Sequence, residues 1–456
     1  MRTFIATFVT VLALCAPGAR AETLADALIA AYRNSNLLDQ NRAVLRAADE
    51  DVAIAVADLR PVIAFAAQAG YARAEFLGPT GARGVNEGLS GTMTLTADLV
   101  VLDFGRSKLA VEVAKESVLA TREALIEVEQ GVLLSAVQAY VQVRLSQEIV
   151  ALRESNFRLI TQELRASQDR FEVGEITRTD VSIAEARLAS SRASLAAAQG
   201  DLMVARESYK AATGAYPGRL AGLPSAPKTA RSLEDAQKVA QNTHPAIHQA
   251  QHQVTIAELN VARSKAGMKP NISARASLSV DGDGLDTEVF GLAMNQTLYA
   301  GGKLSALYRK SLASRDGARA GLHQTSVQVA QNVGNAWSNL VVSAASIDAS
   351  RRQITASQTA FDGVREEAAL GVRTTLDVLD AEQELLDARA ARLQAEAGRY
   401  VGVYGLLSAM GLLTADHLQL GIPIFDATAY YNAVKSAPAT SAQGRKLDKI
   451  LEKIAN

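Results

Sequence analysis

A short stretch that occurs twice constrains this 456-residue chain more than any other feature of its sequence. The first copy is Gly174–Asp180 and the second is Gly371–Asp377, at a constant offset of 197 residues (371 − 174 = 377 − 180 = 197). The register continues without a gap as far as Gly214 and Gly411. A gapless match of this length indicates an internal duplication, so the chain is expected to consist of two similar halves.

Each copy of the repeat predicts a sharp reversal between two helices. Its glycine follows a long helical pattern, at a position where the backbone needs a positive φ. Thr177 and Thr374 stand three residues before Asp180 and Asp377, which is the spacing of a capping box that opens a new helix. Capping alone explains the threonine and the aspartate, but it does not explain Asp380, one helical turn further along.

The first residues have the pattern of a secretory signal peptide, which we place at residues 1–21. Arg2 precedes the apolar stretch Phe4–Ala16, and Ala19–Ala21 has the small-x-small form of a cleavage site. The only cysteine, Cys15, lies in this segment, so the mature chain is expected to have no disulfide. No later run of about 18 apolar residues occurs, so we expect no transmembrane helix.

Four segments predict β-strands, two in each half of the chain. Apolar and polar residues alternate in Leu89–Leu99 and Ile272–Val280, Phe290–Met294 continues the pattern, and Pro61–Ala72 shows it most weakly. A turn over Phe76–Gly88 is expected to join the first pair. Alternation over about ten residues in a secreted protein favours strands of an outer-membrane barrel. A soluble hairpin lying on a helix is the alternative.

Four strands are too few to close a barrel in a membrane. An open edge in lipid leaves backbone groups unpaired, at a cost of several kcal/mol each. Since the smallest membrane barrels have about eight strands, the chain is expected to oligomerise, as a dimer with eight strands or a trimer with twelve.

The fold class predicted is mainly α with a small β part: a tandem-repeat α-helical barrel of long coiled-coil helices, with four strands per chain. Each half reads helix, strand, strand, long helix, helix. The long helices are expected over Gly105–Arg170 and Lys303–Ala368, and the flanking ones over Glu22–Asp58 and Thr177–Thr213. The expected divisions are residues 22–213 for the first repeat, 214–231 for a Gly/Pro-rich linker, 232–411 for the second repeat, and 412–456 for a C-terminal equatorial segment and tail.

Composition and motifs argue against several classes of function. A net charge of −1 gives no reason to expect nucleic acid as a partner. No nucleophile–base–acid set can be read from the sequence, so neither an enzyme nor a cofactor is expected. His244, His248 and His252 fall at i, i+4 and i+8 and could in principle bind a metal. Without a cysteine or a His-Glu-x-x-His motif, a solvated helix face is the favoured interpretation, and no metal site is expected.

Three further motifs carry a resemblance to a known family. They are Asn242–Pro245 after the first helix of the second half, Gln296–Gly302 at a strand-to-helix transition, and Asp426–Tyr431 near the C-terminus. Together with the signal peptide, the repeat and the two tips, they resemble the TolC family of outer-membrane channel-tunnels over about residues 22–434. The last motif is similar to the branch that works with type I secretion exporters.

The resemblance implies a homotrimer whose twelve strands form one barrel in the lipid of the outer membrane. Its helices would form a tunnel through the periplasm, and its inner end would engage a periplasmic adaptor (membrane fusion protein) and an inner-membrane ABC or RND transporter. The function implied is a passive export duct of type I secretion or multidrug efflux. A periplasmic coiled-coil adaptor or a structural coiled-coil protein is the alternative.

The resemblance also assigns roles to residues near the second tip. Asp377 and Asp380 match two acidic rings at the periplasmic aperture, where positions i and i+3 share one helix face. Arg373 matches an arginine that ties the inner coiled coil to its neighbour, with Thr179 as the matching partner. The alternative for Arg373 is a local i,i+4 ion pair with Asp377.

A second tie and the adaptor contacts are implied in the same way. Asp180 matches one member of the second tie, but its tyrosine partner would fall at Ala368, which has no side-chain donor. The tips that would meet the adaptor are Val173, Gly174 and Glu175 in the first copy, and Leu370, Gly371 and Val372 in the second.

Overall fold

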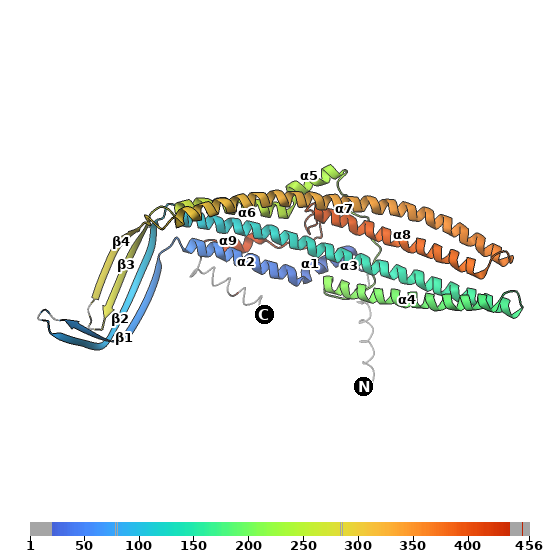
Figure 1. The fold of residues 1–456 in the computed structure, drawn as a ribbon, viewed down its shortest axis with the longest axis horizontal. Helices are drawn as coiled ribbons and strands as arrows, with labels where there is room; N and C mark the ends of the chain where they lie inside the picture. The colour runs from blue at the N-terminus through green and yellow to red at the C-terminus, as the bar shows by residue number, and fades with distance from the viewer. Residues whose placement is uncertain are drawn as a thin grey trace, which may run out of the picture. The chain divides into compact units, whose positions relative to one another are not determined.

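The computed structural model describes residues 21–77, 79, 81–282, 284, 286–437 and 449. The predicted signal peptide, except Ala21, and the tail beyond residue 437, except Lys449, lie outside these residues. The chain is mainly helical with a small sheet, as predicted (Figure 1). The elements in chain order are α1 (Leu24–Asn34), α2 (Asn36–Ala57), β1 (Val62–Leu77), β2 (Arg83–Leu102), α3 (Arg106–Glu172), α4 (Arg178–Thr213), α5 (Leu233–Thr243), α6 (Pro245–Ala266), β3 (Asn271–Asp281), β4 (Asp286–Asn295), α7 (Lys303–Ala369), α8 (Thr375–Ala409) and α9 (Ala427–Val434).

The single helix predicted over Glu22–Asp58 is wrong, because the chain breaks it at Ser35. This residue is extended (φ −76°, ψ 105°), and its hydroxyl accepts the Leu38 N–H at 3.2 Å, which starts α2. The second half has the equivalent break at His244, and Pro245 follows as the first residue of α6. Proline marks the break in only one of the two copies.

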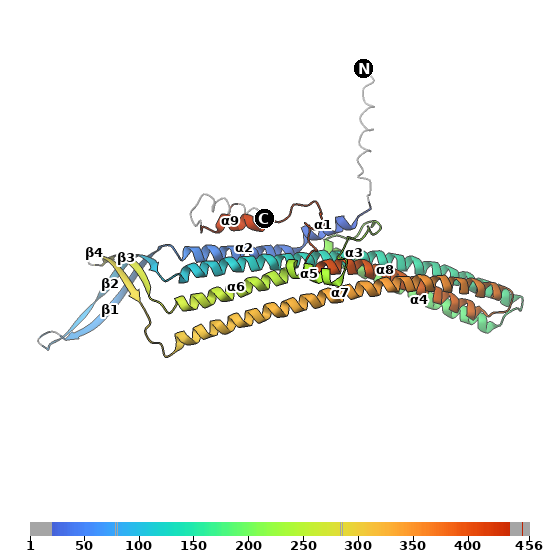
Figure 2. The ribbon, with the colours of Figure 1, turned by 90° about the horizontal axis from the view of Figure 1, so that it is seen from above.

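The first of two compact units comprises the described part of Met1–Asp39 together with Ile126–His244 and Gln328–Ile424. In it α3 turns back into α4, and α7 turns back into α8 (Figure 2). Tyr140 and Tyr209 are fully buried with ring centroids 6.4 Å apart. The Tyr140 hydroxyl lies 3.0 Å and 2.8 Å from the carbonyl oxygens of Glu22 and Ala221, so the segment between the halves is fixed to this core.

One stretch of α3 is apolar enough, by length and composition, to cross a membrane. Forty-four per cent of that stretch is buried inside the protein. The buried core residues Leu133, Val137 and Val141 belong to α3, and core helices of soluble proteins have the same composition. This stretch therefore does not by itself indicate a membrane span.

The ends of α4 and α8 are fastened to the two helix breaks in equivalent ways. Asn34 donates its side-chain amide to the Thr213 carbonyl at 2.8 Å, and Thr243 donates its hydroxyl to the Met410 carbonyl at 2.7 Å. Thr213 is the last residue of α4 and Met410 is the C-cap of α8, so no further residue of either helix can satisfy these carbonyls. Gly411 follows Met410 with φ +77°, so the chain leaves α8 in the left-handed conformation beside this contact.

The second unit comprises Gln40–Leu125, Pro245–Val327 and the described part of Phe425–Asn456. Its four strands form one antiparallel sheet in the order β1-β2-β3-β4. The pairing of β2 with β3 joins the hairpin of the first half to that of the second (Figure 1). The strands β1 and β4 are the edges of this sheet.

One face of the sheet is apolar and the other is polar, as the alternation predicts. Phe65 pairs with Leu95, and Leu95 pairs with Leu278, so these side chains lie on the same face. They are exposed, as Phe65 is at 67%. On the other face Arg275 of β3 forms an ion pair with Asp98 of β2 at 2.6 Å. The register therefore places the directly opposed pairs of large apolar residues on the side away from this ion pair.

The turn predicted over Phe76–Gly88 is too long, because β1 continues to Leu77 and β2 begins at Arg83. A Cβ at Gly84 would lie 2.6 Å from the ring of Phe76, which is its direct partner. The glycine thus lets an aromatic ring cover the neighbouring backbone, a cross-strand packing that stabilises a glycine-containing strand.

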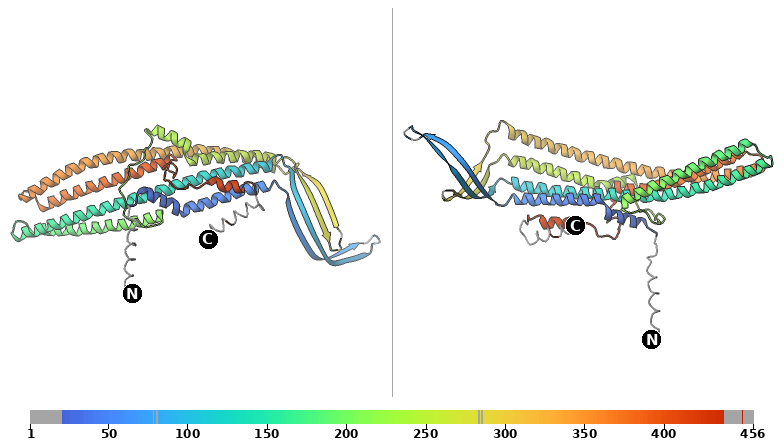
Figure 3. Two further views of the ribbon diagram at one scale, coloured as in Figure 1. Left: turned by 180° about the vertical axis from the view of Figure 1, so that it is seen from behind. Right: turned by 90° about the horizontal axis from the view of Figure 1, so that it is seen from below.

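The short helix α9 lies beside α2 in the second unit (Figure 3). The Tyr430 hydroxyl donates to Glu50 of α2 at 2.7 Å, and the guanidinium of Arg122 on α3 lies 5.3 Å from the centroid of the Tyr431 ring. Arg60 donates to the carbonyl of Ala437 at 2.8 Å. These contacts hold the C-terminal segment along two helices of the same unit.

Candidate functional site

The two predicted tips have the same backbone conformation. Gly174 has φ +77° and Gly371 has φ +78°. In the first tip the Glu175 N–H donates to the Arg170 carbonyl at 2.9 Å, and in the second the Val372 N–H makes the equivalent bond at 3.0 Å. These bonds satisfy carbonyls that the ending helix leaves open. Each tip is therefore a tight helix-to-helix reversal.

A complete capping box opens the helix after each tip. Thr177 and Asp180 bond to each other's backbone N–H at 3.4 Å and 2.9 Å, and Thr374 and Asp377 do the same at 3.2 Å and 3.0 Å. The hydrogen bonds from Thr177 hold the pKa of Asp180 below its usual value, and those from Thr374 do so for Asp377. Both aspartates therefore combine a capping role with a fixed negative charge.

Asp380, one turn beyond the capping box, has an ion-pair partner within the same chain. Arg187 of α4 contacts the Asp380 carboxylate through Nη2. The side chains are 38% and 54% exposed respectively. Sequence reasoning missed this partner, because 193 residues separate the two positions.

Arg373 also pairs within the chain, with a residue that the sequence did not indicate. Its Nε lies 2.8 Å from Oε2 of Glu367 in the last turns of α7. Glu367 is therefore the main partner of Arg373 within the chain, and the charge of Asp377 adds to it in raising the pKa of Arg373. Thr179 is exposed in the first turn of α4, and its contact with an arginine of a neighbouring subunit stays a prediction.

Ala368 stands where the predicted second tie would need a tyrosine, and it makes a different contact. Arg170, near the end of α3, donates from Nη2 to the backbone carbonyl of Ala368 at 3.1 Å. Its Nε also lies 3.1 Å from Glu175 in the first tip. The two hairpins are thus connected through a backbone acceptor, which any residue type at position 368 would supply. A contact of Asp180 with a neighbouring subunit stays a prediction.

The six residues predicted to meet an adaptor are all exposed. Leu370 is 81% exposed, Val372 73% and Val173 71%. Large apolar side chains at this exposure are typical of a surface that another protein covers.

A buried polar pair connects α8 to α3 further along the second hairpin. Asn156 donates its side-chain amide to Oε1 of Glu382 at 2.7 Å, and the two residues are 8% and 6% exposed. Oε2 of Glu382 has no hydrogen-bond partner within the described part of the chain. Burial raises the pKa of Glu382 to about 7, with a smaller contribution from Glu163, while Asn156 and Arg365 act in the opposite direction.

Two of the three histidines interpreted as a solvated face point toward α3 instead, so that interpretation is wrong for these two. His252 Nδ1 lies 2.7 Å from Glu116, and His248 Nδ1 lies 3.5 Å from Glu123. His244 is the residue that ends α5. The described residues contain no group of three or more side chains that could hold a metal ion.

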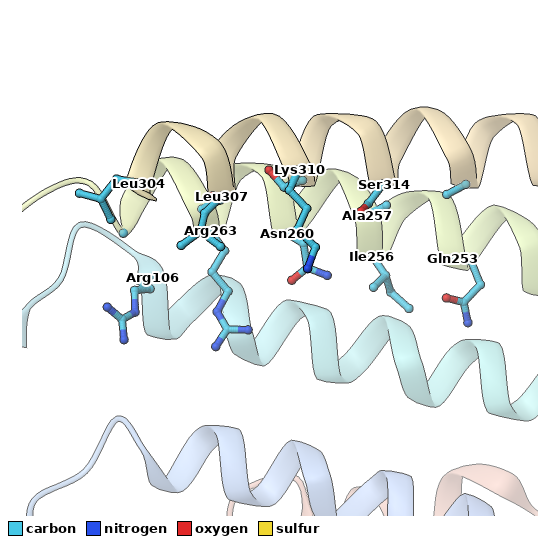
Figure 4. Close-up of a pocket in the computed structure, with 14 residues that line it drawn as sticks. Arg106, Gln253, Ile256, Ala257, Asn260, Arg263, Leu304, Leu307, Lys310 and Ser314 are labelled. Carbon is cyan, nitrogen blue, oxygen red and sulfur yellow. The ribbon is translucent and has the colours of Figure 1, made fainter. Parts of the chain in front are cut away.

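An open groove of about 740 Å³ lies in the second unit between α6 and α7 (Figure 4). It is lined by three cationic side chains, Arg106, Arg263 and Lys310, together with apolar ones such as Leu304 and Leu307. Among the described residues that line it there is neither a carboxylate nor an imidazole. The groove therefore holds no acid–base pair of the kind that hydrolytic chemistry needs.

Comparison with known proteins identifies the family. The profile of the outer membrane efflux protein family matches residues 28–215 and 237–412. The outer membrane efflux protein BepC of Brucella suis is 35% identical over 438 residues, which cover 92% of each chain. The outer membrane protein TolC of Escherichia coli is 23% identical over 86% of this chain and 84% of its own.

Solved structures show the same fold. CusC superimposes with a TM-score of 0.76 at 20% identity, over 86% of this chain and 92% of its own. VceC of Vibrio cholerae superimposes with a TM-score of 0.75 at 21% identity, over 85% of this chain and 96% of its own. The family match covers both halves and leaves no ground for the alternatives of an adaptor or a structural coiled coil. The two tips and the amphipathic sheet agree with the family match and with these relatives. This chain therefore belongs to the outer membrane efflux protein family of channel-tunnels.

Proposed function

We propose that this outer-membrane channel-tunnel is the passive exit duct of a tripartite export system and has no enzymatic activity of its own. The observation that carries the proposal is the four-stranded sheet with an exposed apolar face and two open edges, β1 and β4. Open edges are costly in lipid. Three copies would supply twelve strands (3 × 4) and close one barrel, which makes the working form a homotrimer.

The remaining parts follow from this arrangement. Residues 22–213 and 232–411 would be the two repeats, 214–231 their linker, and 412–456 the equatorial segment and tail. The exposed tips would receive a periplasmic adaptor that connects the duct to an inner-membrane ABC or RND transporter. Relatives support both kinds of system, since PrtF of Dickeya chrysanthemi is named a proteases secretion protein and BepC an outer membrane efflux protein.

The experiment that tests the proposal is single-channel recording of the purified mature protein in a planar bilayer, with Arg373→Ala beside the wild type. We expect a heat-modifiable trimer with a small conductance, which rises several-fold in Arg373→Ala because the tie between neighbouring subunits is lost. Glu367→Gln is the matched control, since it removes the pair within one chain but keeps the arginine. Equal rises in both variants would assign Arg373 to the intrachain pair alone, and a protein that does not insert would refute the duct.

The aperture makes a second prediction. Asp377 and Asp380 of three chains would place six carboxylates around one pore, and such rings attract cations. The double variant Asp377→Asn, Asp380→Asn is expected to lower the cation-to-anion permeability ratio to one or below, measured as the reversal potential in a KCl gradient. Asparagine is chosen because its carbonyl can still accept the Thr374 N–H. Asp387→Asn, further along α8, is the control, and a double variant as selective as the wild type would refute the ring.

A further inference from the structure

We propose that Arg187 sets the charge of the periplasmic aperture by neutralising Asp380 within each chain. The pore would then present half the negative charge of two free acidic rings, with weaker selection for cations and weaker binding of multivalent ones. This inference rests on the proposed function, in which Asp377 and Asp380 line the aperture. Arg187 of α4 would then determine ion specificity together with the two aspartates of α8.

Packing beneath the pair fixes the positions from which the two side chains extend. Ala184 of α4 and Leu379 of α8 are fully buried in one apolar cluster, to which Ile160 of α3 also belongs. Arg187 lies one turn beyond Ala184, and Asp380 directly follows Leu379. The helices are therefore held together at the level of the ion pair by contacts that do not depend on it, although the pair itself is partly exposed.

Asp377 and Arg373, two other charged groups of the second tip, each have a partner of their own. Asp377 caps α8 through Thr374, and Arg373 contacts Glu367. Per chain, Asp377 and Asp380 contribute −2 and Arg187 contributes +1, which leaves −1. Three chains then carry −3 at the aperture rather than −6. In the proposed aperture, a change of three charges would have a large effect on permeating ions, even where the pair adds little to stability.

The pair also departs from the symmetry of the duplication. At the offset of 197 residues Arg187 corresponds to Glu384 (187 + 197 = 384), and Asp380 corresponds to Ile183 (380 − 197 = 183). These two corresponding residues, Glu384 and Ile183, cannot form an ion pair with each other. The arginine therefore acts on only one of the two hairpins, the one that carries both aspartates.

The test compares four proteins whose aperture charges differ in known steps: the wild type (−1 per chain), Arg187→Gln (−2), Asp380→Asn (0) and the double variant (−1). Reversal potentials in a KCl gradient give the permeability ratio, and half-blocking concentrations of spermidine give the affinity for a trivalent cation. Arg192→Gln is the control, because it removes an exposed cation from the same helix away from the pair. Trimer formation of each variant is checked by heat-modifiable mobility.

Arg187→Gln is expected to raise cation selectivity and to lower the half-blocking concentration of spermidine about threefold or more. Asp380→Asn should approach a non-selective pore, and the double variant should return to wild-type behaviour. If Asp380→Asn loses selectivity while Arg187→Gln matches the wild type, the inference is wrong and the acidic ring stands. If neither variant changes selectivity, or if the wild type forms no channel, the proposed aperture itself is refuted.

Discussion

Replacing Gly411 with alanine is expected to destabilise the protein by about 3 kcal/mol or more. A Cβ at this position would lie 2.7 Å from the Cα of His244 and 2.7 Å from the carbonyl oxygen of Thr243. Both are backbone atoms at the break between α5 and α6, so neither can move aside as a flexible side chain would. The φ of +77° adds the strain of a left-handed conformation.

The measurement is the thermal midpoint of the detergent-solubilised protein, followed by circular dichroism. Gly405→Ala is the matched control, because it lies within α8 with no atom within 4 Å of the added Cβ and should gain up to about 1 kcal/mol. Gly214→Ala should fall between the two, since its nearest neighbour is the side chain of Asn34 at 3.1 Å. A Gly411→Ala variant as stable as the wild type would contradict this prediction, because it would show that the backbone of the helix break moves away from the added Cβ at little cost.

Replacing Glu382 with glutamine is expected to stabilise the protein at alkaline pH and to have little effect in acid. The folded pKa of about 7 lies above the ordinary value of 4.5, so the folded chain holds this proton more firmly than the unfolded one. The corresponding stability is fully present below pH 4.5 and is lost as the pH rises through 7. A difference of 2.5 pKa units (7 − 4.5) sets an upper bound of about 3 kcal/mol per chain at pH 8.

The matched control is Glu185→Gln, the position of the first half that corresponds to Glu382 (185 + 197 = 382). Its side chain is exposed, so this substitution should change the thermal midpoint of the protein only slightly at pH 4 and at pH 8. Glutamine at position 382 keeps an acceptor for the amide of Asn156 and removes only the charge. A Glu382→Gln difference that is the same at both pH values would contradict the buried, protonated carboxyl.

Local patterns carried most of the fold. Period-two alternation located the strands and their apolar face, and the glycine and Thr-x-x-Asp spacing located both tips, because each signal depends on neighbouring residues only. The break at Ser35 was missed because its copy lacks the proline that marks the other break. The full length of the first hairpin was missed because it depends on Phe76 covering Gly84 from the opposite strand.

The candidate site was less accessible to sequence reasoning, because its contacts join distant residues. Glu185 and Glu382 occupy the same place in the repeat, yet one is exposed and the other buried, and only the packing of α8 against α3 decides which. Arg187 and Asp380 lie in different halves, so no local spacing connects them. Arg170 donates to a backbone carbonyl, and because every residue type has one, the sequence does not indicate this acceptor.

The open edges of the sheet have a consequence for inheritance. In the proposed trimer, β1 of one chain must pair with β4 of the next, so a single chain with a damaged edge strand would prevent the barrel from closing. If half the chains in a cell carry such damage, roughly one barrel in eight (0.5³) contains only intact chains. In the proposed trimer, edge-strand mutations would therefore be dominant over a normal gene copy. Mutations that prevent a chain from folding at all would remove it from assembly and would be recessive.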